Sequence, residues 1–208
     1  MDDYTTCSTF YFCFVKLKRS SPYGVVGWFG IDLFEAIRGR RSVRRYLDKP
    51  VEEEKVLRCL YAAHWAPSAH NSQPWSFVVV RGPETRRRLA EVHRWGRFMA
   101  EAPVVVAVVG DPGLSSFWRE DLGAAVENML LAAYAQGLGS CWMGVAGTEY
   151  EEPIKRILGI PGGLRVLCMV SLGYPAEKPT RGRQPLKSKV HWEKYGVQRD
   201  FEEPRFPS

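Results

Sequence analysis

The sequence predicts a domain that interleaves helices and strands, and three observations lead to this fold class. Stretches with apolar residues at helical spacing alternate with short continuous apolar runs, which are typical of amphipathic helices and buried strands. The chain of 208 residues is long enough for one domain with a substantial core. Its seven Trp and ten Phe argue against a disordered chain. Periodicity alone does not decide whether the strands run parallel or antiparallel.

Residues 1–30 are predicted to form an N-terminal extension to which the sequence assigns no function. Aromatic, small and basic residues alternate there, and one added strand is expected near Phe10–Val15. This apolar run is short, basic residues follow it, and no small-residue cleavage site comes after it, so it does not have the pattern of a secretory signal peptide. We therefore expect a single domain over residues 31–208.

The first half of this domain is predicted to carry three helices and two strands. Asp32 can cap the first helix, and Gly39 is expected to end it in the left-handed conformation that glycine tolerates. The acidic run Glu52–Glu54 suits the positive N-terminal dipole of the second helix. The predicted elements are a helix over Leu33–Arg38, an extended segment over Arg40–Tyr46, a helix over Glu52–His64, a strand over Trp75–Val80, a helix over Thr85–Arg94, an irregular segment over Trp95–Ala100 and a strand over Pro103–Val109.

The second half is predicted to add two helices and two strands. The longest helix covers Glu120–Gln136, and Gly137 stops it. Thr148 and Glu151 have the spacing of a capping box for a helix that ends near Leu158. The helix stripe expected to face the core is Leu122, Val126, Met129, Leu130 and Ala133, and the two strands are expected over Ser140–Val145 and Leu164–Leu172.

The strongest cluster of charge lies in Arg38–Arg45, which contains five arginines. Arginine binds phosphate through a planar fork of donors, and the net charge of +6 favours anionic partners. One alternative is a solvated or nucleic-acid-binding patch. The cluster is compact, contains Ser42 and lacks interleaved aromatic residues, which favours a single phosphate over a polymer.

A polar loop, Ala66–Phe77, connects the second helix to the first strand. Its Pro, Ser, Asn and Gln residues fix the backbone or offer short hydrogen-bonding groups. Functional residues concentrate on loops that rigid elements hold, so the loop is a candidate for ligand binding. An ordinary connector between helix and strand is the alternative.

Several other kinds of site are not supported by the sequence. Five Cys without a C-x-x-C pair indicate reduced thiols in a cytoplasmic protein, and the four His show no metal-ligand spacing. No apolar run reaches the length of a membrane span. Gly137-x-Gly139 follows a helix and lacks a third glycine, so it is better explained as a helix stop than as a dinucleotide fingerprint. No catalytic dyad or triad is indicated, and the Trp142 and Met143 side chains are expected in the core.

Two motifs resemble those of the FMN-dependent nitroreductase family. They are Arg40-Arg41-Ser42-x-Arg44 and Pro67-Ser68-x-x-Asn71-Ser72-Gln73-Pro74-Trp75, and the similarity extends from about Ile31 to about Tyr195. The resemblance implies an α+β fold with a central, mostly antiparallel sheet flanked by helices. It also implies an intertwined homodimer with two FMN sites at the interface, and the Pro-, Lys- and Arg-rich chain beyond Gly173 is expected to lie on the other subunit.

The resemblance also implies a role for each matched residue. Arg40 and Ser42 would hold the FMN phosphate with Arg41 nearby, and Arg183, with Arg181, would close over it from the C-terminal segment. Arg44 would lie near the pyrimidine edge of the flavin, where a cation stabilises the negative charge of the reduced ring.

The remaining matched residues would surround the ring. Backbone N–H groups around Met143 and Gly144 would face flavin N5, and glycine would permit the close approach. Pro67 and Ser68 would contact the flavin of the partner subunit, while Asn71 and Gln73 would shape their loop or bind the flavin edge.

The expected function is therefore oxidoreduction carried by the flavin rather than by a catalytic side chain. NADH or NADPH would give hydride to flavin N5, and a small organic acceptor such as a nitroaromatic or quinone would take the electrons in a ping-pong cycle. Neither the physiological acceptor nor the choice among NADH, NADPH and a deazaflavin follows from the residues. The alternatives are a flavin- or deazaflavin-binding module without turnover, and a nucleic-acid-binding protein that uses Arg38–Arg45.

Overall fold

The structure is a computed structural model that describes residues 31–204, so the strand predicted near Phe10–Val15 lies outside the described residues. The α-helices of that range are α1 (Leu33–Gly39), α2 (Glu53–His64), α3 (Pro83–Val92), α4 (Trp118–Ala135) and α5 (Glu151–Leu158). The strands are β1 (Trp75–Val80), β2 (Val104–Gly110), β3 (Gly139–Gly144) and β4 (Arg165–Gly173), and short 3₁₀ turns occupy Ala69–Asn71, Arg97–Ala100 and Leu186–Ser188.

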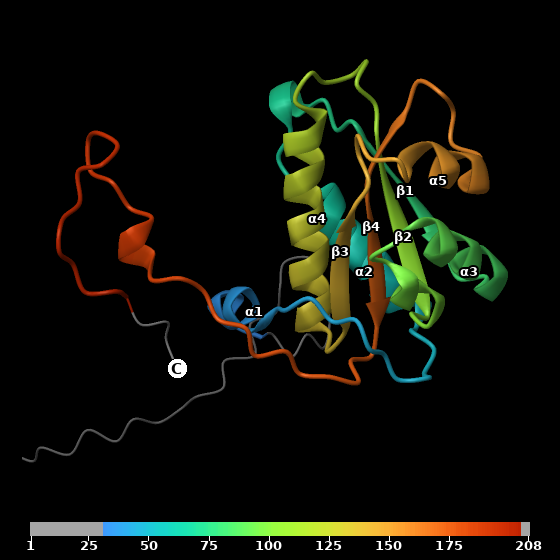
Figure 1. Cartoon of the computed structure of the whole chain (residues 1–208), viewed down its shortest axis with the longest axis horizontal. Coiled ribbons are helices and arrows are strands. Elements are labelled where there is room, and N and C mark those ends of the chain that lie inside the picture. Colours follow the sequence, from blue (N-terminus) through green and yellow to red (C-terminus); the bar gives the residue numbers. More distant parts are fainter. Residues whose placement is uncertain (1–30, 205–208) are drawn as a thin grey trace, which may run out of the picture. The chain divides into compact units, whose positions relative to one another are not determined.

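The four strands form one sheet in the order β1-β2-β4-β3 (Figure 1). Every neighbouring pair is antiparallel, and Val106 of β2 lies between Val79 of β1 and Val170 of β4. The expected α+β class with an antiparallel sheet is confirmed. The central pair β2 and β4 comes from the two strongest apolar runs, because a strand with neighbours on both sides and helices on both faces meets little water.

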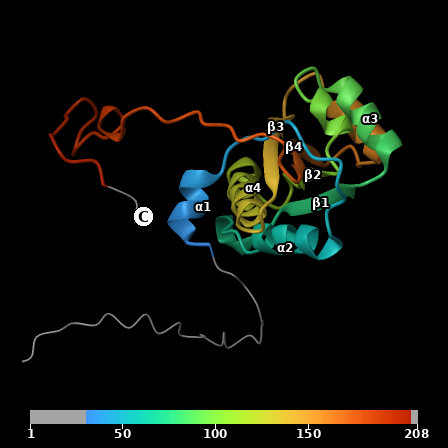
Figure 2. The same cartoon turned by 90° about the horizontal axis from the view of Figure 1, so that it is seen from below.

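Helices cover both faces of this sheet, with α2 and α4 on one face and α3 and α5 on the other (Figure 2). Val104, Val106 and Val108 of β2 pack toward the α2 and α4 side, whereas Val105 and Ala107 pack toward the other side. This division follows from the period of two in a strand. The apolar stripe predicted on α4 is buried.

Two glycines that were predicted to stop helices have different roles. Gly137 ends α4 as expected, with φ of 76° and with its N–H bonded to the Tyr134 carbonyl. Gly39, by contrast, belongs to α1 and does not adopt a left-handed conformation. A Cβ atom on Gly39 would lie 2.0 Å from the Tyr134 hydroxyl oxygen, so glycine lets α1 approach this side chain of α4 closely.

Two further predictions at helix ends are corrected by tertiary contacts. α3 begins at Pro83 and ends at Val92, rather than covering Thr85–Arg94, because His93 leaves the helix with φ −92° and ψ 100° and turns to another element. The capping box predicted for α5 is absent. The Thr148 hydroxyl accepts from the Tyr150 N–H, while the Glu151 carboxylate binds groups outside its helix start.

The chain after β4 first returns to the arginine segment and then becomes exposed. Leu47 N–H donates to the Tyr174 carbonyl, and Ala176 N–H donates to the Arg45 carbonyl. Most residues from Glu177 onward are exposed, and they stand clear of the sheet in Figures 1 and 2. Within residues 31–204, every helix is too short or too polar to cross a membrane.

Candidate functional site

A cavity of about 770 Å³ opens beside the outer edge of β3, the edge that faces away from β4. It brings together Arg44, Met143 and Gly144, three of the residues expected around a flavin ring, from segments about a hundred positions apart in the sequence. Its full lining is Arg44, His93, Trp95, Phe98, Cys141, Trp142, Met143, Gly144, Thr148, Glu149 and Tyr150.

The edge of β3 presents backbone N–H groups on the side of the cavity. In an antiparallel ladder the N–H and C=O of one residue point to the same side, and the side alternates along the strand. The Ser140 carbonyl accepts from Val43 N–H at 2.9 Å, so the backbone N–H and C=O of Ser140 point away from β4. Trp142 and Gly144, two and four residues further on, therefore also point their N–H groups away from β4. Both of these residues line the cavity.

The walls beside this edge are aromatic and leave room for a planar group. A Cβ atom on Gly144 would meet no described atom within 4 Å, so a ligand can approach the backbone there. Trp142 is 37% exposed, which makes the prediction of a core tryptophan wrong, whereas Met143 is buried as predicted. The aromatic lining residues are Trp95, Phe98, Trp142 and Tyr150, together with the imidazole of His93.

The arginine segment is held against this edge by backbone contacts. Besides the bond from Val43, the N–H groups of Arg44 and Arg45 donate to Oε1 of Glu177, at 2.6 and 3.2 Å. These bonds fix the backbone of Arg44, while its side chain reaches the cavity. Arg44 thus brings a positively charged residue to the wall of the cavity, and its contact with a pyrimidine edge stays a prediction.

The structure brings together the two basic segments that were predicted to bind phosphate. Nε of Arg41 donates to the Arg181 carbonyl at 2.9 Å, and its Nη1 donates to the carbonyls of Arg38 and Arg40. The Arg41 guanidinium therefore connects backbone segments. Nε of Arg40 lies 3.2 Å from Oε1 of Glu127 on α4, and Arg183 is exposed.

Ser42 faces a buried thiol beside the cavity. Burial raises the pKa of the Cys141 thiol, and the charge of Arg44 and a hydrogen bond with Ser42 oppose that change only partly. The thiol is therefore protonated near neutral pH and is a poor nucleophile.

The polar loop does not line this cavity, and Pro67, Ser68, Asn71 and Gln73 are not among the residues that surround it with Arg44. Its bonds are mostly internal. Oγ of Ser68 accepts from Gln73 N–H at 3.0 Å, and Nε2 of Gln73 donates to the Asn71 carbonyl at 3.2 Å. Asn71 and Gln73 adopt positive φ angles of 56° and 47°. Both residues therefore shape the loop, which is one of the two roles expected for them.

Asp121 of α4 anchors this loop and was not identified from the sequence. Its Oδ1 accepts from Ala69 N–H at 2.8 Å, and its Oδ2 accepts from the Ser115 hydroxyl at 2.7 Å. Asp121 is buried, with only 6% of its surface exposed. An acidic residue in the first turn of a helix is common at the surface, so its sequence position carries no signal for this role.

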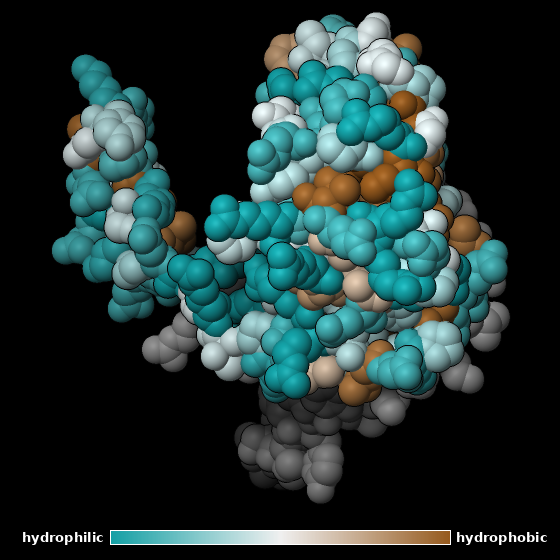
Figure 3. Space-filling view, turned by 45° about the vertical axis from the view of Figure 1, so that its right-hand side comes forward, coloured by the Kyte–Doolittle hydropathy of each residue, from teal (hydrophilic) through white to brown (hydrophobic). Residues whose placement is uncertain are grey.

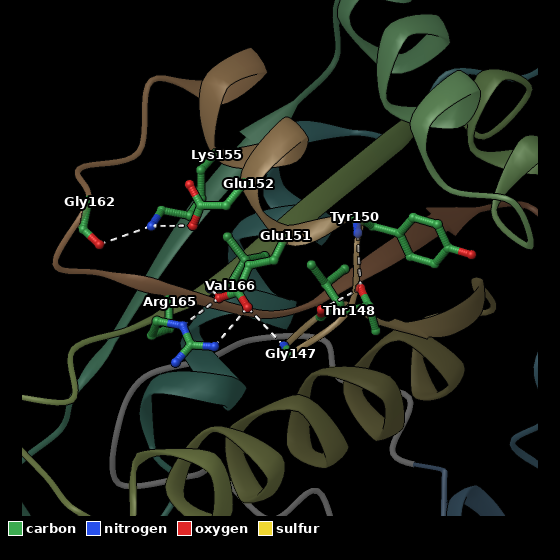
Figure 4. Close-up of polar contacts among 10 residues, drawn as sticks. Gly147, Thr148, Tyr150, Glu151, Glu152, Lys155, Gly162, Arg165 and Val166 are labelled. Carbon is green, nitrogen blue, oxygen red and sulfur yellow. Dashed lines mark hydrogen bonds and ion pairs between the residues drawn. The ribbon is translucent and has the colours of Figure 1, made fainter.

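A half-buried ion pair supports the loop between β3 and α5 (Figure 4). Nε and Nη2 of Arg165 donate to Oε1 and Oε2 of Glu151 at 2.7 and 2.8 Å, in the two-pronged geometry favoured by arginine. The N–H groups of Gly147 and Val166 also donate to the same carboxylate, at 2.8 and 3.0 Å. The Glu151 carboxylate therefore binds Arg165 and Val166 of β4 as well as the loop before its own helix.

This ion pair changes the acidity of Glu151. Desolvation by burial raises the pKa of the carboxyl, but hydrogen bonds from Arg165, Gly147 and Val166 outweigh burial and lower the pKa to about 2. Glu151 is consequently ionised in the folded protein at neutral pH. Because the carboxylate holds Gly147, it also fixes the start of the loop that carries Thr148, Glu149 and Tyr150 to the cavity wall.

The fold and the site together identify the family to which this chain belongs. An antiparallel α+β domain presents strand-edge N–H groups, an arginine and aromatic walls to one cavity, and it gathers further arginines nearby. A model of the nitroreductase family matches residues 37–96 and 92–174. The chain belongs to this family, as its two motifs indicated.

Known proteins of similar sequence or structure agree with this assignment. A relative from Methanothermobacter thermautotrophicus, named as an NADH dehydrogenase or NAD(P)H nitroreductase, is 40% identical over 171 residues, which cover 79% of this chain and 88% of the relative. The FMN-dependent nitroreductase of Clostridium difficile R20291 superposes with a TM-score of 0.74 at 31% identity, over 78% of this chain and 99% of its own. A nitroreductase of Desulfovibrio desulfuricans, solved in complex with FMN, superposes with a TM-score of 0.70 at 34% identity, over 79% and 98%.

Proposed function

We propose that the protein is an FMN-dependent oxidoreductase that passes electrons from NADH or NADPH to a small organic acceptor such as a nitroaromatic or quinone. The observation that carries this proposal is the cavity in which Arg44 and the N–H groups of Trp142 and Gly144 converge between aromatic walls. Relatives named for NAD(P)H and FMN support it. When bound, FMN would accept hydride at N5 and return the electrons to the acceptor in a ping-pong cycle.

The residues of this chain have distinct roles in that site. The strand-edge N–H groups orient the ring and stabilise the negative charge of its reduced form, and Arg44 adds a cation. Arg40, Ser42, Arg181 and Arg183 bind the phosphate, while Arg41 keeps the two basic segments together. Aromatic walls exclude water and present a flat surface to nicotinamide and acceptor in turn.

We further propose a homodimer in which each polar loop completes the cavity of the partner. Pro67 and Ser68 lie outside the cavity of their own chain, and α1 and α2 expose large apolar side chains. On the face drawn in Figure 3, a patch of hydrophobic surface lies between hydrophilic regions. Such patches are typical of interfaces. The exposed residues are Leu33, Phe34 and Ile37 of α1, Leu57 and Tyr61 of α2, and Trp65 just after α2. A cytoplasmic location is also proposed, since the cysteines of the described range, Cys59, Cys141 and Cys168, are free and buried.

An anaerobic titration tests the proposed function. The purified protein should be yellow with the absorption spectrum of FMN, and NADH or NADPH should bleach it in the absence of oxygen. Bound FMN that neither nucleotide bleaches would instead support a flavin-binding module without turnover. A colourless protein that takes up no FMN but binds DNA or RNA would support the nucleic-acid alternative.

Replacement of Arg40 by Ala is expected to weaken FMN binding by about 1.5–3 kcal/mol, the range of a hydrogen bond to a charged group. Equilibrium dialysis of the apoprotein against FMN measures this loss. Arg45→Ala is the matched control, because it removes the same charge from the same segment at a residue outside the predicted set. Equal affinities of Arg40→Ala and the wild type would contradict the phosphate assignment.

The proposed dimer should be obligate, with an interface on the order of 2,000 Å² or more. Light scattering at micromolar concentration should give about twice the chain mass of 23.6 kDa. A monomeric mass under these conditions would refute this assembly.

A further inference from the structure

His93 lines the cavity and contacts three of its neighbours: Gly144 of β3, Tyr150 of the loop before α5, and the turn after α3. It lies just after α3, is only 3% exposed, and places Nε2 at 3.0 Å from the carbonyl oxygen of Gly144. A carbonyl oxygen can only accept, so Nε2 carries the proton and donates. The ring also stacks on Tyr150, with centroids 4.5 Å apart and planes inclined by 33°.

The neighbours of His93 hold its ring in one orientation. A Cβ atom on Gly96 would lie 3.1 Å from both Cγ and Nδ1 of the ring, so the turn after α3 closes tightly over it. Nδ1 is buried and has no hydrogen-bond partner among the described residues. The turn, the Nε2 bond and the Tyr150 stack thus contact different sides of the imidazole, and little freedom remains for it.

The bond to Gly144 acts where the edge of β3 is least constrained. Gly144 is the last residue of the strand, and its N–H and C=O both point away from β4. With no side chain, Gly144 has the greatest backbone freedom of the residues on this edge. The next residue, Val145, donates its N–H to the Leu167 carbonyl. His93 therefore supplies the hydrogen bond that holds the outer side of Gly144.

We propose that His93 is a positioning residue, which keeps the Gly144 backbone aimed at the flavin ring and fixes Tyr150 beside it. The inference rests on the proposed function, because it assigns the Gly144 N–H to the flavin. His93 acts through the backbone and does not itself touch the reacting atoms. Since negative charge develops on the ring during reduction, a well-held N–H should favour reduced over oxidised FMN.

Two variants distinguish the effect of the N–H donor from the effect of the volume of the ring. His93→Leu keeps an apolar side chain of similar size without a donor, whereas His93→Gln retains an N–H at a similar reach. In His93→Leu the Kd of oxidised FMN should rise a few-fold and that of reduced FMN about tenfold, a factor that corresponds to about 1.4 kcal/mol. His93→Gln should restore most of both affinities. Arg88→Leu, at an exposed residue of α3 that does not line the cavity, is the control and should bind FMN normally.

Hydrogen exchange of the apoprotein tests the same contact without cofactor. Backbone amides of residues 143–150 should exchange about tenfold faster in His93→Leu than in the wild type, with His93→Gln near the wild type. Unchanged exchange in His93→Leu, or equal exchange rates and FMN affinities in the two variants, would overturn the inference. A wild type that binds no FMN would contradict the proposed function instead, and exchange would still decide whether His93 holds Gly144.

Discussion

Glu151→Gln should destabilise the folded protein by about 3 kcal/mol at pH 7. The substitution removes the charge that Arg165 and two backbone N–H groups bind, and a hydrogen bond to a charged group typically contributes about 1.5–3 kcal/mol. Chemical denaturation at constant temperature measures the difference. Glu152→Gln is the matched control one residue further along α5, because Glu152 is exposed and its partner Lys155 also binds the Gly162 carbonyl. The control should lose less than about 1 kcal/mol.

The same pair predicts how stability depends on pH. The pKa of Glu151 is about 2 in the folded protein and 4.5 in its reference state, so the unfolded chain takes up the proton first. The contribution of Glu151 is therefore fully present above about pH 4.5 and is lost as the pH falls toward 2. Glu151→Gln should lack this part of the acid dependence, whereas Glu152→Gln should keep it. Parallel curves for Glu151→Gln and the wild type between pH 4.5 and 3 would show that the carboxylate is not coupled to folding.

Ser68→Trp should reduce FMN affinity about 10- to 100-fold, the second large effect expected. An indole placed where the proposed dimer packs its polar loop against the ring would overfill the pocket, and overpacking typically costs 1–3 kcal/mol. The phosphate residues stay intact, so residual binding should depend on phosphate and should not discriminate reduced from oxidised flavin. Fluorescence quenching of FMN titrated with apoprotein measures the affinity.

A second substitution at the same position is the control. Ser68→Ala removes the hydroxyl that accepts from Gln73 N–H but adds no bulk, so it should bind FMN within a few-fold of the wild type. Loss in both variants would indicate that loop shape, and not occupation of the pocket, limits binding. Unchanged FMN affinity in Ser68→Trp, or full occupancy in a forced monomer, would rule out the proposed site shared between subunits. Because cofactor and dimer stabilise each other by mass action, FMN should also raise the melting temperature.

The order and type of the elements could be predicted because their signals are local. Apolar runs predicted β2 and β4 within a residue or two, and helical spacing predicted the buried stripe of α4. Arg44 could be selected as a cavity residue because it lies in a family motif, and Met143 and Gly144 because the wider resemblance to the family covers them. Errors occurred where a residue serves a distant partner. Glu151 lies where a charge at a helix start is common, and Trp142 is a large apolar residue of the kind usually found in a core. In the structure Glu151 instead binds Arg165, and Trp142 is partly exposed.

The sequence by itself determined the secondary-structure pattern, the fold class through its motifs, and the family. Only the tertiary structure decided which groups meet: Glu151 with Arg165 across 14 positions, His93 with Gly144 across 51, and Arg41 with the Arg181 carbonyl across 140. Periodicity and capping act between neighbours along the chain, so residue order reveals them. Contacts between distant residues depend on strand order and register, which are set by packing of the whole core, and no single segment of the sequence encodes them.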